Sequence, residues 1–173
     1  MADAGRSIAV HNAHPRLRLA GREVERVVSV LDSHAVKFLG GCPPGELSIA
    51  FLTNPALAQI HASFMNDPSA TDVITFEGNP HTGQAGEICV SADTAAQYVG
   101  LPPGSGTKPA PQPTPALQKK FSAELTLYLI HGWLHLAGYD DLKPAKKRRM
   151  RAAEKRALAL LQATKAVPSF RFG

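Results

Sequence analysis

The stretch that decides the fold is Glu124-Leu-Thr-Leu-Tyr-Leu-Ile-His-Gly-Trp-Leu-His-Leu-Ala-Gly-Tyr-Asp-Asp141. Its first seven residues are apolar at nearly every position and include no Gly or Pro, which predicts a helix that is buried on most sides. His131 and His135 are four residues apart, so both imidazoles leave the same face of this helix. Gly138 can adopt the left-handed conformation that ends a helix, and the chain then folds back with Asp141 placed as a third metal ligand.

Two imidazoles and one carboxylate suit zinc, because three protein ligands and one open position are typical of catalytic zinc sites. The same histidine spacing occurs in zinc peptidases, in which the residue after the first His is a Glu that acts as general base. Here that residue is Gly132, so a zinc peptidase or amidase would lack its base. The simpler alternative is a pair of hydrogen-bonded helix histidines without a metal, and the Gly and carboxylate that follow favour the metal.

The segment His131-Gly-Trp-Leu-His-Leu-Ala-Gly-Tyr-Asp140 resembles the signature His-Gly-x-Leu-His-Leu-x-Gly-Tyr-Asp-His of the YbeY family of bacterial rRNA maturation factors. Two further segments are similar to family motifs, Thr-Asp-Val-Ile-Thr-Phe at 71–76 and Gly-Glu-Ile-Cys-Val-Ser at 86–91. The chain departs from the family at two positions. Asp141 stands where most members have a third His, and Met65 stands where the family has an Arg credited with an essential catalytic role.

The resemblance covers about residues 46–161 and implies an α+β fold. In this fold a small mixed sheet of about four strands packs with about five helices, and the metal site lies on a helix and the turn after it. Independently of the resemblance, the alternation of predicted strands and helices along the chain agrees with this class.

The resemblance also implies a function, namely zinc-assisted hydrolysis of phosphodiester bonds in single-stranded RNA. The expected roles are maturation of the 16S rRNA 3′ end and ribosome quality control, with rRNA and the small ribosomal subunit as partners. One Zn²⁺ is expected per chain, held by His131, His135 and Asp141. Asp140 and Glu124 are candidate catalytic residues beside these ligands, and a plain salt bridge is the alternative for each. Because of Met65, a non-catalytic, metal-stabilised rRNA-binding factor remains the second interpretation.

The length of 173 residues and the 44% hydrophobic content predict one domain over 1–173. Its core is expected at about 5–163, with a Pro-rich loop at about 101–115 and a loose tail at 164–173. No apolar run approaches the ~20 residues that span a bilayer, and the N-terminus lacks the order of a signal peptide. Two cysteines without a motif favour a reducing cytoplasm. The oligomeric state stays open.

The net charge of +5 favours a polyanionic partner. Many of the basic residues directly follow the metal motif, and a solvated helix face is the alternative explanation for them. Their position beside the proposed metal favours contacts with RNA phosphates. The residues predicted to bind RNA are Lys147, Arg148, Arg149 and Arg151.

Hydrophobic periodicity and turn residues place the remaining elements. Strands are expected at 7–12, 46–53, 71–76 and 86–91, with the second in the centre of the sheet. Helices are expected at 21–39, 54–64, 91–99 and 144–163 besides the metal helix. Asn54 and Ser91 are expected as N-caps. Trp133 and Tyr139 are expected in the core rather than stacked on bases.

Overall fold

The computed structural model describes residues 5–65, 72–101 and 113–173. Its strands are β1 Arg6–Asn12, β2 Leu17–Arg18, β3 Gly45–Leu52, β4 Val73–Glu77, β5 Gln84–Ser91 and β6 Arg171–Phe172. Its α-helices are α1 Gly21–Ser33, α2 Asn54–Met65, α3 Ala92–Val99, α4 Pro115–Ala137 and α5 Pro144–Ala163, and short 3-10 helices cover Ala35–Lys37 and Pro80–Thr82. Among these described helices, none is long and apolar enough to cross a bilayer.

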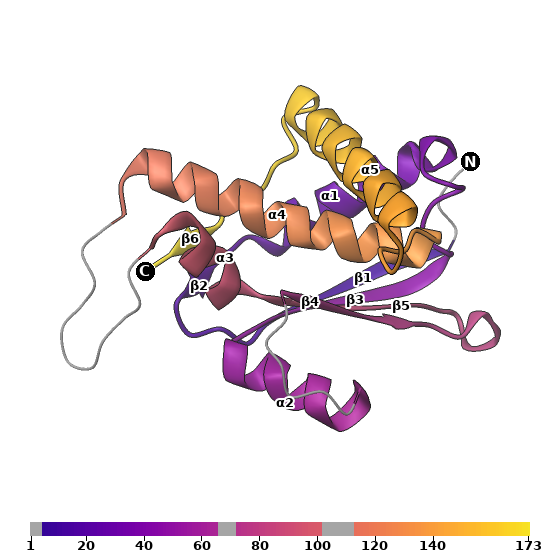
Figure 1. The fold of residues 1–173 in the computed structure, drawn as a ribbon, viewed down its shortest axis with the longest axis horizontal. Coiled ribbons are helices and arrows are strands. Elements are labelled where there is room, and N and C mark those ends of the chain that lie inside the picture. Colours follow the sequence, from indigo (N-terminus) through magenta and orange to yellow (C-terminus); the bar gives the residue numbers. More distant parts are fainter. Residues whose placement is uncertain (1–4, 66–71, 102–112) are drawn as a thin grey trace.

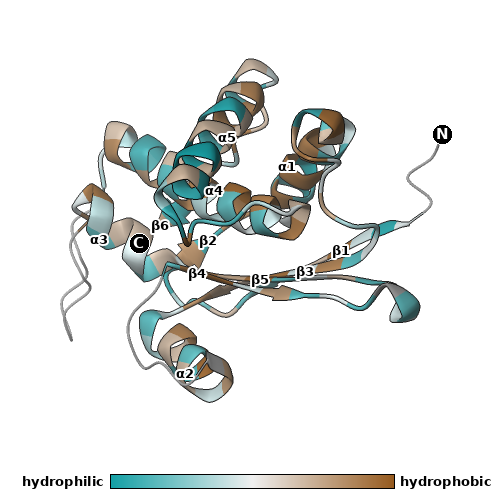
Figure 2. Ribbon diagram, turned by 45° about the vertical axis from the view of Figure 1, so that its right-hand side comes forward, coloured by the Kyte–Doolittle hydropathy of each residue, from teal (hydrophilic) through white to brown (hydrophobic). Residues whose placement is uncertain are grey.

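The main sheet has the strand order β1-β3-β5-β4. β3 pairs in parallel with β1 and β5, and β4 runs antiparallel to β5. Helices α1, α4 and α5 cover one face of the sheet and α2 lies alone on the other (Figures 1 and 2). The predicted α+β class, with a mixed four-stranded sheet and five helices, is confirmed, and β3 is central because its apolar run needs cover on both faces.

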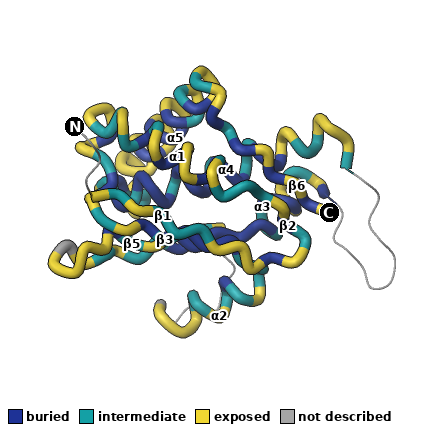
Figure 3. Tube along the Cα trace, turned by 180° about the vertical axis from the view of Figure 1, so that it is seen from behind, coloured by how far each residue is buried: buried dark blue, intermediate teal, exposed yellow. Residues whose placement is uncertain are grey.

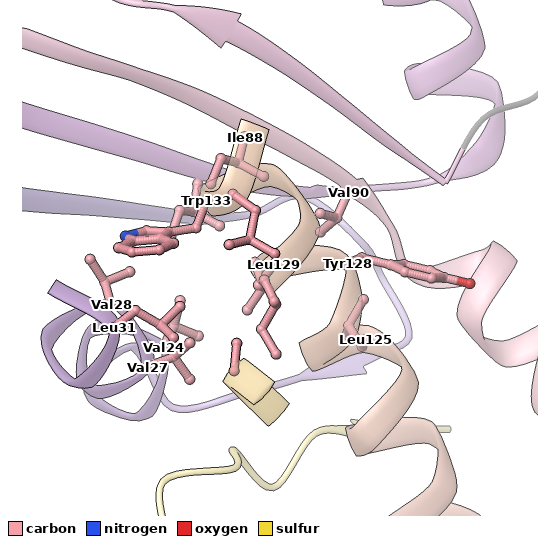
Figure 4. Close-up of a cluster of buried hydrophobic side chains, with 14 of the residues drawn as sticks. Val24, Val27, Val28, Leu31, Ile88, Val90, Leu125, Tyr128, Leu129 and Trp133 are labelled. Carbon is pink, nitrogen blue, oxygen red and sulfur yellow. The ribbon is translucent and has the colours of Figure 1, made fainter. Parts of the chain in front are cut away.

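The main core lies between α4, α1 and the sheet, and the strands run through the most buried part of the molecule (Figure 3). Trp133 of α4 is 1% exposed and packs among side chains from α1 and β5 (Figure 4). Its indole Nε1 donates a hydrogen bond to Asp32 Oδ1 at 3.1 Å, and Arg6 pairs with the other carboxylate oxygen at 2.9 Å. Tyr139 is also buried. Both aromatic residues therefore belong to the core.

Helix α4 is fixed at both ends by its local sequence. The Thr114 side chain accepts a hydrogen bond from the Leu117 amide at 3.2 Å, and Pro115 takes the first helical position. At the other end Gly138 has φ +113°, the left-handed conformation expected of it. The helix begins at Pro115, nine residues before Glu124, and most of the Pro-rich loop expected at about 101–115 lies outside the described residues.

The close approach of α4 to β5 requires the glycine in the motif. A Cβ at Gly132 would lie 2.5 Å from Cγ2 of Ile88, far inside van der Waals contact. The residue is buried against the sheet rather than turned toward the histidines. A side chain at Gly132 would therefore require either the Ile88 side chain or the metal helix to move.

One helix boundary and one capping residue differ from the prediction. α1 ends at Ser33 instead of continuing to residue 39, because the chain tightens into a 3-10 turn and Leu39 adopts φ +56°. At α2 the side chain that caps the helix is Thr53, whose Oγ1 accepts a hydrogen bond from the Ala56 amide. Asn54 is therefore not the cap, and its Oδ1 accepts hydrogen bonds from the hydroxyls of Ser91 and Thr94.

The expectation of a loose tail at 164–173 is wrong. Phe170 and Phe172 are almost fully buried, and β6 forms a two-stranded antiparallel sheet with β2. Phe170 packs on Phe51 with ring centroids 5.5 Å apart. The end of the chain closes the core near the start of α4, where Ser122 hydrogen-bonds to Phe170 in both directions.

Candidate metal centre

The end of α4 and the turn after it bring three ligand groups together. His131 and His135 lie one turn apart on α4, and their Nε2 atoms are 3.0 Å apart. Each Nε2 is 3.8 Å from an oxygen of Asp141, which the turn at Gly138 carries back over the helix. All three ligand atoms lie within 4.8 Å of one another.

These separations fit a tetrahedral metal. Two ligands at the distances usual for zinc lie about 3.4 Å apart across a tetrahedral angle. The two Nε2 atoms are 3.0 Å apart, and each is 3.8 Å from a different oxygen of Asp141. The ligand side chains are 20–38% exposed, so the site opens to solvent on one side. The donor set is therefore compatible with zinc, and the assignment of His131, His135 and Asp141 as ligands stays a prediction.

Glu154 of α5 orients one of the two imidazoles. Its Oε1 lies 3.4 Å from Nδ1 of His131, and its side chain is 8% exposed. A proton on Nδ1 shared with this carboxylate leaves the lone pair of Nε2 free for a metal. Glu124, the candidate residue that precedes His131 by seven residues on α4, has a different partner. Its carboxylate accepts a hydrogen bond from the phenol of Tyr128.

A hollow of about 190 Å³ adjoins two of the three ligands, His131 and Asp141, between α4, α5 and the start of β4. Carboxylates and cations share its wall. The residues that line it are Asp72, Glu124, Leu127, Tyr128, His131, Asp141, Lys147, Met150, Arg151 and Glu154. We call this hollow the metal-side cavity. It brings residues from three separate segments of the sequence to the metal ligands.

The four basic residues predicted to bind RNA occupy three different places. Lys147 and Arg151 line the metal-side cavity. Arg148 is on the exposed outer face of α5, beside these two and Lys155. Arg149 lies in a separate hollow beyond the turn after α4. Only Lys147 and Arg151 among the four are therefore positioned to meet a phosphate held beside the ligands.

Asp140 lies with Arg149 in that separate hollow rather than in the metal-side cavity. Its carboxylate pairs with Lys146 Nζ at 3.1 Å, and this contact lowers the pKa of Asp140. The salt bridge considered as the alternative for Asp140 is thus the contact that the side chain makes. Its catalytic role stays a prediction without a contact to the ligands among the described residues.

The surroundings of the site lower the pKa of one imidazole and raise the pKa of one carboxyl. Burial, followed by the charge of His131, lowers the pKa of His135, so this ring stays unprotonated and available as a ligand to lower pH. Burial also raises the pKa of Glu124, against the hydrogen bond from Tyr128. Burial raises the pKa of Tyr128 itself, and its phenol stays protonated.

The sequence profile of the family described as Endoribonuclease YbeY matches residues 10–100 and 108–162. The chain belongs to the YbeY family. A protein named Endoribonuclease YbeY from Chlamydia felis is 33% identical over 124 residues, which span 68% of this chain and 70% of that protein. One of the same name from Syntrophotalea carbinolica is 30% identical over 155 residues, spanning 85% and 90% of the two chains.

A solved structure shares the fold of this chain. The solution structure of a Thermotoga maritima protein covers 94% of this chain with 95% of its own, at a TM-score of 0.54 and 20% identity. This likeness concerns the fold alone. The profile match begins at residue 10, well before residue 46, at which the resemblance seen in the sequence begins.

Sequence reasoning missed Glu154 as the partner of His131. A signal was present, because Glu154 falls on the same face of α5 as the buried Met150, Ala157 and Leu161. An acid on an apolar helix face needs a buried partner. Two positions of interest in the family comparison, Thr71 and the side chain of Met65, lie outside the described residues.

Proposed function

We propose that this member of the YbeY family is a metal-dependent endoribonuclease that hydrolyses single-stranded RNA. The metal is zinc, one ion per chain, held by His131, His135 and Asp141. The substrate is rRNA of the small ribosomal subunit, processed in the cytoplasm at the 3′ end of 16S rRNA and in ribosome quality control. The relatives named Endoribonuclease YbeY support the reaction class.

One observation carries the proposal at the level of residues. The three ligand groups lie within 4.8 Å of one another at the edge of a cavity whose wall also holds Lys147 and Arg151. A metal ion bound there supplies Lewis-acid chemistry, since it polarises a phosphoryl oxygen and makes water a stronger nucleophile. A metal beside two cations suits a phosphodiester, whose anionic oxygens gain negative charge as the bond breaks.

The residues of the chain have separate tasks in this reaction. Glu154 fixes the ring of His131 through Nδ1. Lys147 and Arg151 bind the phosphate oxygens, and the guanidinium can do so with two hydrogen bonds. These two cations supply positive charge that Met65 cannot. Glu124, with its raised pKa, lies in the same cavity and can hold or release a proton there.

A peptidase is disfavoured by the packing of α4. In zinc peptidases with this histidine spacing, the general base is the residue after the first His. Here that position is Gly132, and its missing side chain would point at Ile88 of the sheet, 2.5 Å away. The helix therefore offers no room for a base at that position. The cations of Lys147 and Arg151 in the cavity wall can bind RNA phosphates but have no corresponding role with a peptide substrate.

The first experiment is cleavage of a single-stranded RNA by the purified protein, with and without a chelator. His135→Ala is the inactive variant, and His81→Ala is its matched control, because His81 is exposed in the 3-10 turn before β5. We expect the wild type and His81→Ala to cleave the RNA when metal is present, and His135→Ala not to cleave it. The chelator should abolish cleavage by all of them. Equal cleavage by the wild type and His135→Ala would refute a metal-dependent nuclease.

The effect of metal removal on the fold distinguishes the enzyme from the second interpretation, a metal-stabilised rRNA-binding factor. A catalytic site open on one side should lose its metal to a chelator while the fold persists, whereas a structural site should unfold with the loss. The hydrophobic core of this chain lies under α4, away from the exposed edges of the ligands. We therefore expect the circular dichroism spectrum to survive chelation. Unfolding on chelation would favour the binding factor.

A further inference from the structure

Helix α5 carries positive charge that the helix itself does not balance. Glu154 is the only acidic residue in Pro144–Ala163, and it is buried against His131 rather than exposed beside the cations. Like charges one turn apart destabilise a helix. Helix α1, by contrast, places Glu23 and Glu25 next to its arginines. The charge of α5 therefore lowers the stability of its own helix, and its use lies elsewhere.

Some cations of α5 have partners within the protein. Lys146 pairs with Asp140 at 3.1 Å, and Arg156 donates a hydrogen bond to the carbonyl of Lys37 at 3.3 Å. Four other cations are exposed and have no hydrogen bond or ion pair with any described residue. All four line one groove, and they are Lys147, Arg148, Arg151 and Lys155. Their charges are thus available to an anion from outside.

This groove is continuous with the metal-side cavity. It has a volume of about 500 Å³, and Pro144 and Ala152 complete its wall. We call it the α5 groove. Lys147 and Arg151 line both the α5 groove and the metal-side cavity. α5 lies on the far side of α4 from the sheet (Figure 1). A polyanion that passes over these two cations can therefore occupy both sites.

The cations are spaced along the helix axis as a strand of nucleic acid requires. Lys147, Arg151 and Lys155 follow one another at intervals of four residues, so they form one stripe along α5. The stripe is about 12 Å long, because an α-helix rises about 1.5 Å per residue. Phosphates of a stacked strand advance about 3.4 Å each. The stripe therefore spans about three phosphates beyond its first cation.

We propose that the α5 groove is a second backbone-binding site, which holds the RNA strand on one side of the bond that is cleaved at the metal centre. This inference rests on the proposed function. Arg148 and Lys155 bind phosphates that lie outside the metal-side cavity. Contacts to phosphates carry no sequence information, so the groove adds affinity for a longer strand of any sequence. Arg149 takes no part, because it lies in the separate hollow beyond the turn after α4.

The test is the salt dependence of RNA binding, measured by fluorescence anisotropy with a labelled single strand that a gel shows to stay intact. The variant is Arg148→Ala/Lys155→Ala, which keeps both cations of the metal-side cavity. The matched control is Lys119→Ala/Lys120→Ala, because these exposed lysines carry the same charge near the opposite end of α4 from the metal ligands. Arg148→Lys/Lys155→Arg keeps both charges in the groove.

Each phosphate contact of a single strand contributes about 0.7 to the slope of log K against log salt concentration. Loss of two contacts should therefore reduce that slope by about 1.4 and weaken binding about 25-fold at 0.1 M salt. We expect this result for Arg148→Ala/Lys155→Ala, and slopes close to wild type for the other two variants. An unchanged slope overturns the inference. An equal change in the lysine control also overturns it, because net charge alone would then be responsible.

An acidic protein segment is the other polyanion that such a groove could attract. A labelled polyglutamate peptide of the same length as the RNA is therefore measured in parallel. We expect the RNA to bind more tightly and to lose more affinity with Arg148→Ala/Lys155→Ala. If the peptide binds as tightly as the RNA and its slope falls by the same amount, the assignment of the groove to RNA is refuted.

Failure of the proposed function has a different signature. In that case the wild type does not cleave RNA in a metal-dependent manner, while the effect of Arg148→Ala/Lys155→Ala on the salt slope can still be present. Conversely, metal-dependent cleavage together with an unchanged slope refutes the role of the α5 groove alone. Binding and cleavage therefore report on the two proposals separately.

Discussion

Replacement of Gly132 by Ala tests whether the metal helix is seated on the sheet as described. In an unobstructed helix interior, Ala is more favourable than Gly by about 1 kcal/mol. At Gly132 the new Cβ would lie 2.5, 3.1 and 3.2 Å from Cγ2, Cγ1 and Cδ1 of Ile88. Normal carbon contacts are about 3.5–4.0 Å, so either the Ile88 side chain or the helix must move.

The magnitude follows from two opposing terms. Overpacking of a filled core costs about 1–3 kcal/mol, and the helix propensity of Ala returns about 1 kcal/mol of this. Gly132→Ala should therefore lower the free energy of unfolding by about 0–2 kcal/mol. Ile88→Ala removes all three crowding atoms. In that background the same Gly132→Ala substitution should stabilise the protein by about 1 kcal/mol.

The assay is a double-mutant cycle measured by urea denaturation, with Trp133 fluorescence and circular dichroism as probes. The expected coupling between the two positions is about 1–3 kcal/mol, the overpacking term alone. Gly21→Ala is the control, because a Cβ at Gly21 meets no atom within 4 Å, and its effect should stay within about 0.5 kcal/mol. If Gly132→Ala stabilises the wild type as much as it stabilises Ile88→Ala, the described packing of α4 on β5 is wrong.

Three further substitutions test other contacts. Glu154→Leu should weaken zinc binding about 10- to 100-fold, because His131 loses its orienting acceptor, and an unchanged affinity in a chelator competition would exclude that role. Burial raises the pKa of Glu124 above 4.5, so the folded state holds its proton more tightly than the unfolded state does, and wild-type stability should fall relative to Glu124→Gln as the pH rises above that value. A constant difference across urea titrations at pH 4 to 7 would contradict this. Phe170→Ala should lower the free energy of unfolding by about 3–5 kcal/mol, whereas a loose tail would show almost no effect.

Most of the fold could be predicted from local sequence features, because each of these helices and strands is specified by residues within its own segment. α5 begins at Pro144 as predicted and ends close to the predicted boundary, and Gly138 ends α4 as expected. The interior position of β3 followed from its nearly continuous apolar sequence. In these elements propensity, patterning and capping all favour the same structure.

The errors concern contacts between segments far apart in the sequence. β6 consists of two residues and is a strand only because β2 pairs with it, so no local pattern indicates it. α1 ends early at Ser33, although the apolar spacing continues to the buried Phe38 in a tighter turn. The spacing of residues on one helix also could not decide between Glu124 and Glu154 as the partner of His131, because Glu154 reaches it from another helix.

The charges of the metal-side cavity couple the binding of the metal ion to the binding of the RNA phosphate. Its described wall holds four carboxylates, from Asp72, Glu124, Asp141 and Glu154, against the cations of Lys147 and Arg151. A phosphate entering this wall alone would meet more negative than positive charge. A divalent ion at the ligands offsets that excess, so metal and RNA phosphate should each increase the affinity for the other by the same factor. On this argument Lys147 and Arg151 attract RNA to the cavity, and the metal makes the cavity able to hold its phosphate.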